Sequence, residues 1–198
     1  MVPGDRALDI GCGPGVLLDE LARRVGTDGV AGVDPSEPFV AAARAAVPNA
    51  DVRLAPAEQL PFDTDAFDVA LSQLVVNFMS DAEAGVGQMR RVARRAVTSC
   101  VWDYAGEMTM LRAFWDAALE LDADAPDEAA ARCRRALRQL RRLLVAVHAG
   151  IAPSGAYCAS LDEKQQTALQ EACFRRLGSP RGSFSLSARA WFVTGSTL

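Results

Sequence analysis

The sequence predicts an α/β fold, a doubly wound and mainly parallel sheet with an antiparallel C-terminal strand. Three observations support this prediction. Short apolar runs alternate with segments of helical periodicity through the first half of the chain. A glycine-rich turn, GCGPG at residues 11–15, separates the first apolar run from the first helical pattern. Near the end, residues 183–193 alternate apolar and polar residues as a half-buried strand does.

The first half supplies most of the strands. Apolar runs predict strands at residues 6–10, 29–34, 51–54, 67–72 and 96–102. Between them, a first helix is expected to end at Gly26, and a second is expected to begin at Ser36 with Pro38 in its first turn. A third helix, capped by Ser80 and Glu83, ends in the run MRRVARR at residues 89–95.

The second half is mainly helical. Helices are expected around residues 111–119, 127–147 and 160–177, the last one capped by Ser160 and Glu163. We therefore predict one domain over 1–198, in which 1–102 is the strand-rich half, 103–182 a helical region and 183–193 the final strand. A sheet built this way lacks one edge strand if nothing near residues 143–148 pairs with the final strand.

Composition reduces the number of function classes that the chain could belong to. The net charge of −4 gives no reason to expect nucleic acid or an anionic membrane as partner, although arginines crowd residues 132–142. Five scattered cysteines without a CxxC pair, and the single His148, predict neither a disulfide framework nor a metal site. The chain shows no apolar run of about 20 residues that could span a membrane. A cytoplasmic location follows as the expectation.

The glycine turn indicates a ligand site. Gly11, Gly13 and Gly15 let the backbone approach a ligand at a helix N-terminus, although a tight turn without a ligand is the alternative. The dinucleotide pattern G-x-G-x-x-G fails because Val16 stands at its third glycine. Asp9 precedes the turn, and Asp34 ends the second strand, where a carboxylate can accept hydrogen bonds from both ribose hydroxyls.

Four segments together resemble the class I S-adenosylmethionine-dependent methyltransferases, especially small-molecule and quinone-biosynthesis members. They are ALDIGCGPG (7–15), GVDPS (32–36), AEQLPFDTDAFDVALSQLVVNF (57–78) and the helix ending MRRVARR (89–95). The resemblance implies a Rossmann-like fold, S-adenosylmethionine as cofactor, and in-line methyl transfer to a small-molecule acceptor. An NAD(P)-dependent oxidoreductase and a non-catalytic cofactor-binding remnant are the alternatives.

The resemblance also implies roles for individual residues. The Gly11–Gly15 loop, with Cys12, would hold the methionine part and the ribose edge. Asp9 would hold the loop and the ammonium group, and Asp34 the ribose hydroxyls. The remaining cofactor positions are Pro35, Ala57, Glu58, Ser72 and Gln73.

On the acceptor side, Gln73 and Asn77 are the candidates for orienting a substrate, and His148 is the one conventional base. The identity of the acceptor is not readable from these residues. Relatives carry a helical segment before the first strand, whereas this sequence reaches its first strand almost at once. We therefore expect weak turnover from this chain, and self-association through an exposed sheet edge.

Overall fold

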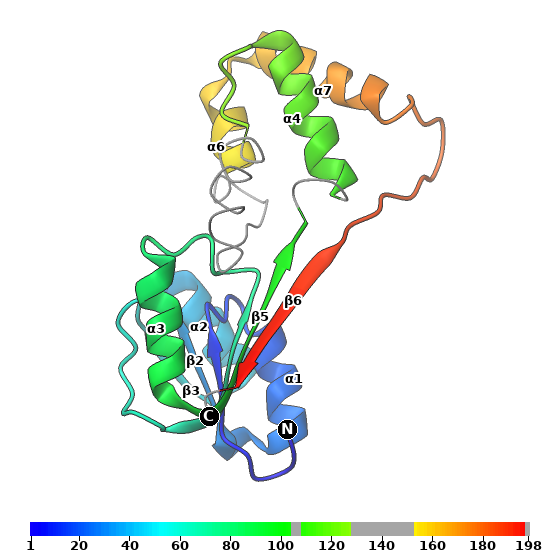
Figure 1. Ribbon diagram of the computed structural model, residues 1–198. Coiled ribbons are helices and arrows are strands. Elements are labelled where there is room, and N and C mark those ends of the chain that lie inside the picture. The colour runs from blue at the N-terminus through cyan, green and yellow to red at the C-terminus, as the bar shows by residue number, and fades with distance from the viewer. Residues whose placement is uncertain (104–107, 128–152, 197–198) are drawn as a thin grey trace. The chain divides into compact units, whose positions relative to one another are not determined.

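The structure is a computed structural model that describes residues 1–103, 108–127 and 153–196 (Figure 1). These residues form two compact units. The first, called the sheet unit, comprises Met1–Val101 together with the strand residues from Phe192 onward. The second, called the helical unit, lies within Trp102–Trp191. The helix expected at 127–147 and the strand partner considered near 143–148 fall almost entirely outside the described residues.

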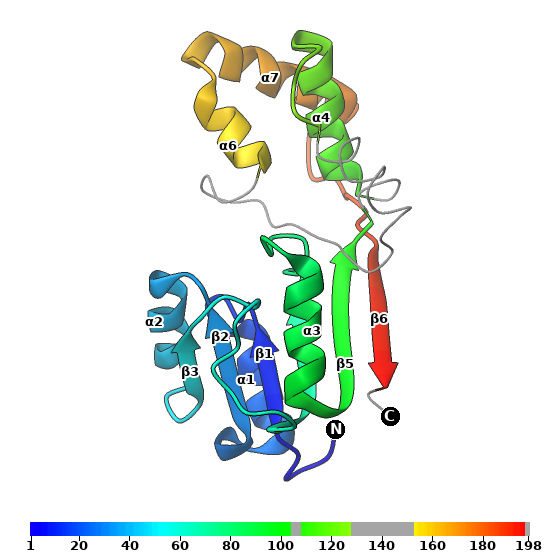
Figure 2. The ribbon, with the colours of Figure 1, turned by 60° about the vertical axis from the view of Figure 1, so that its left-hand side comes forward.

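The described strands form one sheet in the order β3-β2-β1-β4-β5-β6. The first five strands pair in parallel. Figure 2 shows β6 running opposite to its neighbour β5. The predicted doubly wound sheet with an antiparallel C-terminal strand is therefore confirmed. The strand bounds are β1 (Ala7–Ile10), β2 (Val30–Asp34), β3 (Asp51–Leu54), β4 (Phe67–Gln73), β5 (Ala93–Trp102) and β6 (Ala190–Ser196).

Helices in the sheet unit cover both faces of this sheet. They are α1 (Val16–Val25), α2 (Glu37–Ala46), α3 (Ala82–Val92) and the short 3₁₀ helix η1 (Thr27–Gly29). Leu8 and Ile10 of β1 share a buried cluster with Met89 of α3, whereas Ala7 belongs to a second cluster with Leu18 of α1. Alternate residues of one strand thus face opposite layers, as a sheet buried on both sides requires.

The third helix begins one residue later than predicted. The side chain of Asp81, not Ser80, caps α3, and one of its oxygens accepts hydrogen bonds from the N–H groups of Glu83 (3.0 Å) and Ala84 (3.1 Å). A carboxylate is the stronger acceptor beside the positive end of a helix. The expected Ser80 cap is therefore wrong.

The strand that follows α3 also begins earlier than expected. Helix α3 ends at Val92, and β5 starts directly at Ala93 instead of residue 96. Both residues are fully buried. The chain thus passes from helix to strand without a loop, and the last residues of MRRVARR are extended.

The helical unit contains α4 (Thr109–Leu121), α6 (Pro153–Ser160) and α7 (Glu163–Arg176). The helix expected over 160–177 begins only at Glu163, and the expected Ser160 cap is wrong. Asp162 caps α7 instead, in a reciprocal pair of hydrogen bonds with Gln165 at 2.8 and 2.9 Å. Helix α6 was not predicted, because Pro153 and Gly155 weaken the helical signal there.

The final strand begins later than the alternating sequence suggested. Residues 183–189 have no regular structure, and β6 starts at Ala190. The segment before it is held by the start of α4 and the residue after β5. Thr109 Oγ1 donates to the Ser187 carbonyl (2.9 Å), and Arg189 pairs with the buried Asp103 carboxylate (2.5 Å). Alternation alone therefore placed the strand too early.

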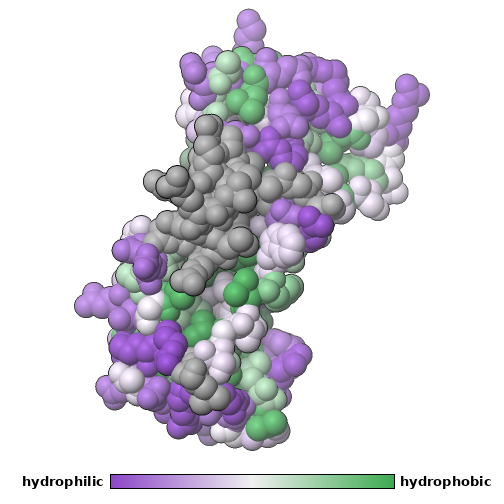
Figure 3. Space-filling model, in the orientation of Figure 1, coloured by the Kyte–Doolittle hydropathy of each residue, from purple (hydrophilic) through white to green (hydrophobic). Residues whose placement is uncertain are grey.

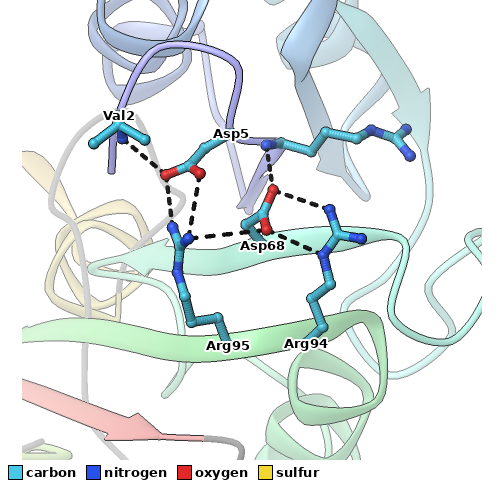
Figure 4. A network of polar contacts seen from close by, with 6 residues as sticks. Val2, Asp5, Asp68, Arg94 and Arg95 are labelled. Carbon is cyan, nitrogen blue, oxygen red and sulfur yellow. Dashed lines mark hydrogen bonds and ion pairs between the residues drawn. The ribbon is translucent and has the colours of Figure 1, made fainter.

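A network of charged residues joins the N-terminal segment to the starts of β4 and β5 (Figure 4). Arg95 pairs with Asp5 at 2.6 Å, and Arg94 pairs with Asp68 at 3.0 Å. The Arg6 backbone N–H also donates to Asp68 at 2.8 Å. Asp5 and Asp68 are largely shielded, whereas their arginine partners are about half exposed, so water partly screens these contacts. They fix the end of the sheet opposite to the glycine turn.

Asp68→Asn should destabilise the protein at neutral pH and leave it unchanged in strong acid. The hydrogen bonds from Arg94, and then from Arg6, hold the pKa of Asp68 below its ordinary value. The stabilisation is therefore present above the unfolded-state pKa and is lost as the pH falls through the folded-state pKa. Circular dichroism during acid titration measures this. Unfolding at the same pH in Asp68→Asn and in the exposed control Asp63→Asn would contradict the prediction.

Candidate cofactor site at the carboxyl ends of β1, β2 and β4

The glycine turn folds back against the second strand. Gly11, Gly13 and Gly15 have φ values of +70°, +52° and +95°, a region that favours glycine. The N–H groups of Gly11 and Cys12 donate to the Val33 carbonyl of β2 at 2.8 and 2.9 Å. The turn is thereby held at the carboxyl ends of β1 and β2, directly before α1, where parallel sheets bind ligands.

The three glycines are needed for different reasons. A Cβ at Gly11 would come within 2.4 Å of the Val75 side chain, and one at Gly15 within 3.2 Å of the Ala43 backbone. A Cβ at Gly13 would meet no atom of the described residues within 4 Å. Gly11 and Gly15 therefore allow close packing of the protein itself, whereas Gly13 borders open space that a ligand can enter.

Asp34 holds the turn in place. Its carboxylate is 6% exposed and accepts hydrogen bonds from the N–H groups of Gly13 (3.0 Å) and Ser36 (2.8 Å), one on each oxygen. It is thus not a solvated loop acid. A carboxylate has about four lone-pair positions, so positions for two hydroxyl donors remain. The structure therefore gives Asp34 a structural role that is compatible with binding a ribose.

Asp9 is a buried acid without a hydrogen-bond partner. It is 1% exposed, and neither carboxylate oxygen has a partner among the described residues. Burial, and secondly the charge of Asp34, raises the pKa of Asp9 to about 7, while the nearby N–H of Leu18 lowers it by a smaller amount. Two acids this close, one of them unpartnered, favour a ligand that brings a positive charge or hydrogen-bond donors.

Cys12 contributes its backbone to the turn and not a reactive thiol. The side chain is buried in the cluster that includes Leu18 and Val40. Burial, followed by the charges of Asp9 and Asp34, raises the pKa of its thiol to about 12. Since the thiolate is the nucleophilic form, Cys12 is inert at neutral pH.

The loop after β3 lies beside the end of β2, because Ala55 N–H donates to the Asp34 carbonyl (3.1 Å). Pro35 is exposed at this edge, and Ala57 is buried in the core. Glu58 Oε1 accepts hydrogen bonds from Ser80 Oγ (2.9 Å) and Asp81 N–H (3.1 Å). Burial raises the pKa of Glu58, but these bonds outweigh that effect and leave it below its ordinary value. Glu58 therefore anchors the loop before α3.

The end of β4 gathers polar groups without partners. The Ser72 hydroxyl is buried, both amide atoms of Asn77 are buried, and neither group has a hydrogen bond in the part of the chain described. Gln73 is exposed at the end of the strand. Ser99 of β5, the register neighbour of Ser72, also has an unpartnered hydroxyl. The structure thus places Asp9, Ser72 and Ser99 towards the carboxyl ends of adjacent central strands.

Two residues at this edge were missed in the sequence. Val75 packs against Gly11, and Ser99 faces the same side of the sheet as Ser72. The signal for Ser99 was a pair of polar residues inside the apolar run AVTSCVW. Leu74, with φ of +61°, marks a strained turn between β4 and Val75. No sequence pattern indicated the contact between Val75 and Gly11.

Other candidate groups lie elsewhere. His148 and the arginine-rich segment at 132–142 are outside the described residues. Within those residues, no group of three or more His, Cys, Asp or Glu side chains could hold a metal ion. Likewise, no helix in the described ranges is long and apolar enough to cross a membrane.

The parallel sheet, the glycine turn and the acid at the end of β2 define a Rossmann-like nucleotide-binding unit. Comparison with known proteins specifies the family. Residues 8–98 match the methyltransferase domain family. This match, over a little less than half of the chain, supports a class I S-adenosylmethionine-dependent methyltransferase domain.

Individual relatives are similar over part of their length. A 37.1 kDa protein in transposon TN4556 of Streptomyces fradiae is 33% identical over 129 residues, covering 63% of this chain and 34% of the relative. A ubiquinone biosynthesis O-methyltransferase of Rhizobium leguminosarum is 39% identical over 84 residues, covering 40% and 32%. The chain spans about a third of the length of these curated relatives.

Solved structures also resemble the chain. An S-adenosylmethionine-dependent methyltransferase from Mesorhizobium loti is 26% identical, with a TM-score of 0.48, and the match covers 54% of this chain and 50% of that one.

Proposed function

We propose that this protein transfers a methyl group from S-adenosylmethionine to a small-molecule acceptor. Two features support this best: the Asp9 carboxylate has no hydrogen-bond partner among the described residues, and the turn that follows β1 is open at Gly13. Asp9 suits the ammonium group of the methionine part, and Asp34 retains lone-pair positions for the ribose hydroxyls. The residues present therefore fit this cofactor.

S-adenosylmethionine supplies a methyl group that is already activated on a sulfonium, so the protein's task is positioning and exclusion of water. Gly13 keeps the cofactor space free of side-chain atoms, while Asp34 fixes the loop through Gly13 and Ser36. Preorganised donors and acceptors of this kind need no reorganisation when the ligand binds.

On the acceptor side, we propose that Gln73 and Asn77 orient the substrate. Gln73 is the last residue of β4, and Asn77 follows the strand. The buried amide of Asn77 lacks partners among the described residues, and a bound hydroxyl or carbonyl group could provide them. The O-methyltransferase activity named for the ubiquinone-biosynthesis relative supports an acceptor with a hydroxyl group. We further propose a cytoplasmic location, which suits the free Cys12, Cys100, Cys158 and Cys173.

The experiment is methyl transfer from labelled S-adenosylmethionine into a whole-cell extract, with products identified by mass spectrometry. We expect a labelled small molecule with the wild-type chain and none with Asp34→Ala. Label in nucleic acid would contradict the proposed acceptor class. Tight binding of S-adenosylhomocysteine without any transfer would instead favour a non-catalytic cofactor-binding protein.

The glycine turn offers a matched pair of variants. Gly13→Ala should cost about 1–2 kcal/mol of stability, from the left-handed backbone alone, because its methyl group meets no protein atom. Gly11→Ala should cost about 1–3 kcal/mol more, because its methyl group overlaps Val75. Urea unfolding measures both changes. Binding of S-adenosylhomocysteine should weaken about tenfold or more in Gly13→Ala. Normal binding there would mean that the turn does not contact the cofactor.

We also propose that two copies associate through β6. This strand ends the described sheet, and its sequence AWFVTGS contains no charge or proline to discourage edge pairing. Trp191, Phe192 and Val193 are 52%, 75% and 51% exposed. An antiparallel pair of identical strands satisfies a two-fold symmetric contact.

Light scattering tests the association. Wild type should show the mass of a dimer, and Phe192→Lys, which places a charge on the edge strand, should show that of a monomer. A monomeric wild type would exclude this association. A dimer that persists in Phe192→Lys would place the contact elsewhere.

A further inference from the structure

The helical unit has an open groove of its own between α4, α6 and α7. Its volume is about 380 Å³, within the range of small-molecule sites. Hydrophilic residues cover most of the face of this unit seen in Figure 3, and apolar residues occupy small areas between them. The groove is lined by Phe114, Cys158, Gln166, Leu169, Gln170, Cys173, Phe174 and Leu177.

The lining is uncharged. The Gln166 amide is already used, because its Nε2 donates to the carbonyls of Cys158 and Leu161, both at 3.0 Å. The charged residues at the end of α7 do not line the groove, and Arg175 and Arg176 pair with Glu120 of α4 at 3.2 and 3.0 Å. A charged ligand would thus find no counterion among the lining residues, so the lining favours a neutral, apolar one.

The walls of the groove are well supported on one side. Phe114 packs edge-to-face against Trp115 at 5.0 Å and against Tyr157 at 6.4 Å. Leu169 is almost fully buried. Phe174, in contrast, is 46% exposed and has room to gain contacts. An apolar molecule in the groove would cover part of this ring, and that burial is favourable in proportion to the area removed from water.

We propose that this groove binds a neutral, apolar small molecule. This binding does not depend on the proposed methyltransferase function. The groove shares no residue with the glycine turn, because every lining residue belongs to the helical unit. Cofactor binding and groove binding are therefore expected to respond to different substitutions.

The test uses N-phenyl-1-naphthylamine, an uncharged apolar dye that fluoresces when it leaves water. The full chain should bind it with saturation. Phe174→Asp should weaken binding about tenfold, by removing apolar contact and placing a charge in the groove. Phe184→Asp is the matched control, since Phe184 is 54% exposed and outside the groove. Equal weakening by both variants, or by neither, would overturn the proposal.

Thiol labelling gives an independent measurement. Cys158 and Cys173 both line the groove and are partly exposed, whereas Cys12 and Cys100 are buried elsewhere. Saturating dye should slow maleimide modification of Cys158 and Cys173, resolved by peptide mass spectrometry, and leave Cys12 and Cys100 unchanged. Absence of protection would contradict occupancy of the groove.

The two proposals can fail separately. S-adenosylhomocysteine binding should be the same in wild type and Phe174→Asp. If the dye binds as predicted and the cofactor does not bind at all, the proposed function fails and the groove remains. Displacement of the dye by a second protein, and not by apolar small molecules, would show that the groove is a protein-docking surface. That result would also overturn the proposal.

Discussion

Asp9→Asn should stabilise the protein without ligand by up to about 4 kcal/mol at pH 8. The wild-type carboxyl has a pKa of about 7 when folded, against an ordinary value of 3.8. The folded state therefore binds more protons between these pH values, so its stability falls as the pH rises through this window. About three pKa units correspond to roughly 4 kcal/mol. An asparagine removes this cost because it carries no charge.

The same substitution should weaken binding of S-adenosylmethionine. Loss of a charged acceptor for the ammonium group corresponds to about 1.5–3 kcal/mol, or roughly 10- to 150-fold in affinity. Urea unfolding between pH 4 and 8 and calorimetric titration at pH 8 measure the two effects. A variant less stable than wild type at pH 8, with unchanged affinity, would show that Asp9 is a structural acid. Asp63→Asn, at an exposed position, should change neither quantity.

Asp34→Ala should lose both loop geometry and cofactor affinity. The carboxylate accepts from Gly13 and Ser36, and each hydrogen bond to a charged group contributes about 1.5–3 kcal/mol. Affinity for S-adenosylhomocysteine should fall roughly 10- to 150-fold, because the ribose hydroxyls lose their acceptor. Calorimetry measures the affinity, and urea unfolding measures the stability.

Two further variants separate the roles of Asp34. Asp34→Asn keeps one acceptor oxygen but turns an NH₂ towards the second backbone N–H, so it should show most of the same loss. Asp28→Ala, an exposed acid just before β2, should behave as wild type. Unchanged affinity in Asp34→Ala would mean that the acid holds the loop and does not touch the ribose.

The order and type of elements in the first half were predictable from local pattern. Apolar runs bounded by glycine or charged residues located β1 to β4 to within a residue or so. The helix caps were less predictable, because Ser80 and Ser160 each have an aspartate one or two residues later that binds the helix N-terminus instead. The start of β6 depends on where a neighbouring strand is available for pairing. The alternation of apolar and polar residues carries no information about that pairing.

The candidate site was predictable as a set of positions but not as a set of contacts. Three glycines between a strand and a helix identified the turn, and the acid after β2 identified Asp34. That Asp34 is buried and bonded to Gly13 depends on the fold, as does the lack of a hydrogen-bond partner for Asp9 among the described residues. Glu58 was predicted as a cofactor residue, and its hydrogen bonds to Ser80 and Asp81 were not predicted. These bonds join residues more than twenty positions apart, which local sequence pattern does not reveal.

The central claim, that the glycine turn with Asp9 and Asp34 forms an S-adenosylmethionine site, is tested most directly by calorimetric titration of the full chain with S-adenosylhomocysteine and with NAD. We predict saturable binding of S-adenosylhomocysteine at one site per chain, lost in Asp34→Ala, and no comparable binding of NAD. Tighter binding of NAD, or binding of S-adenosylhomocysteine that is indifferent to Asp34→Ala and Gly13→Ala, would contradict the account.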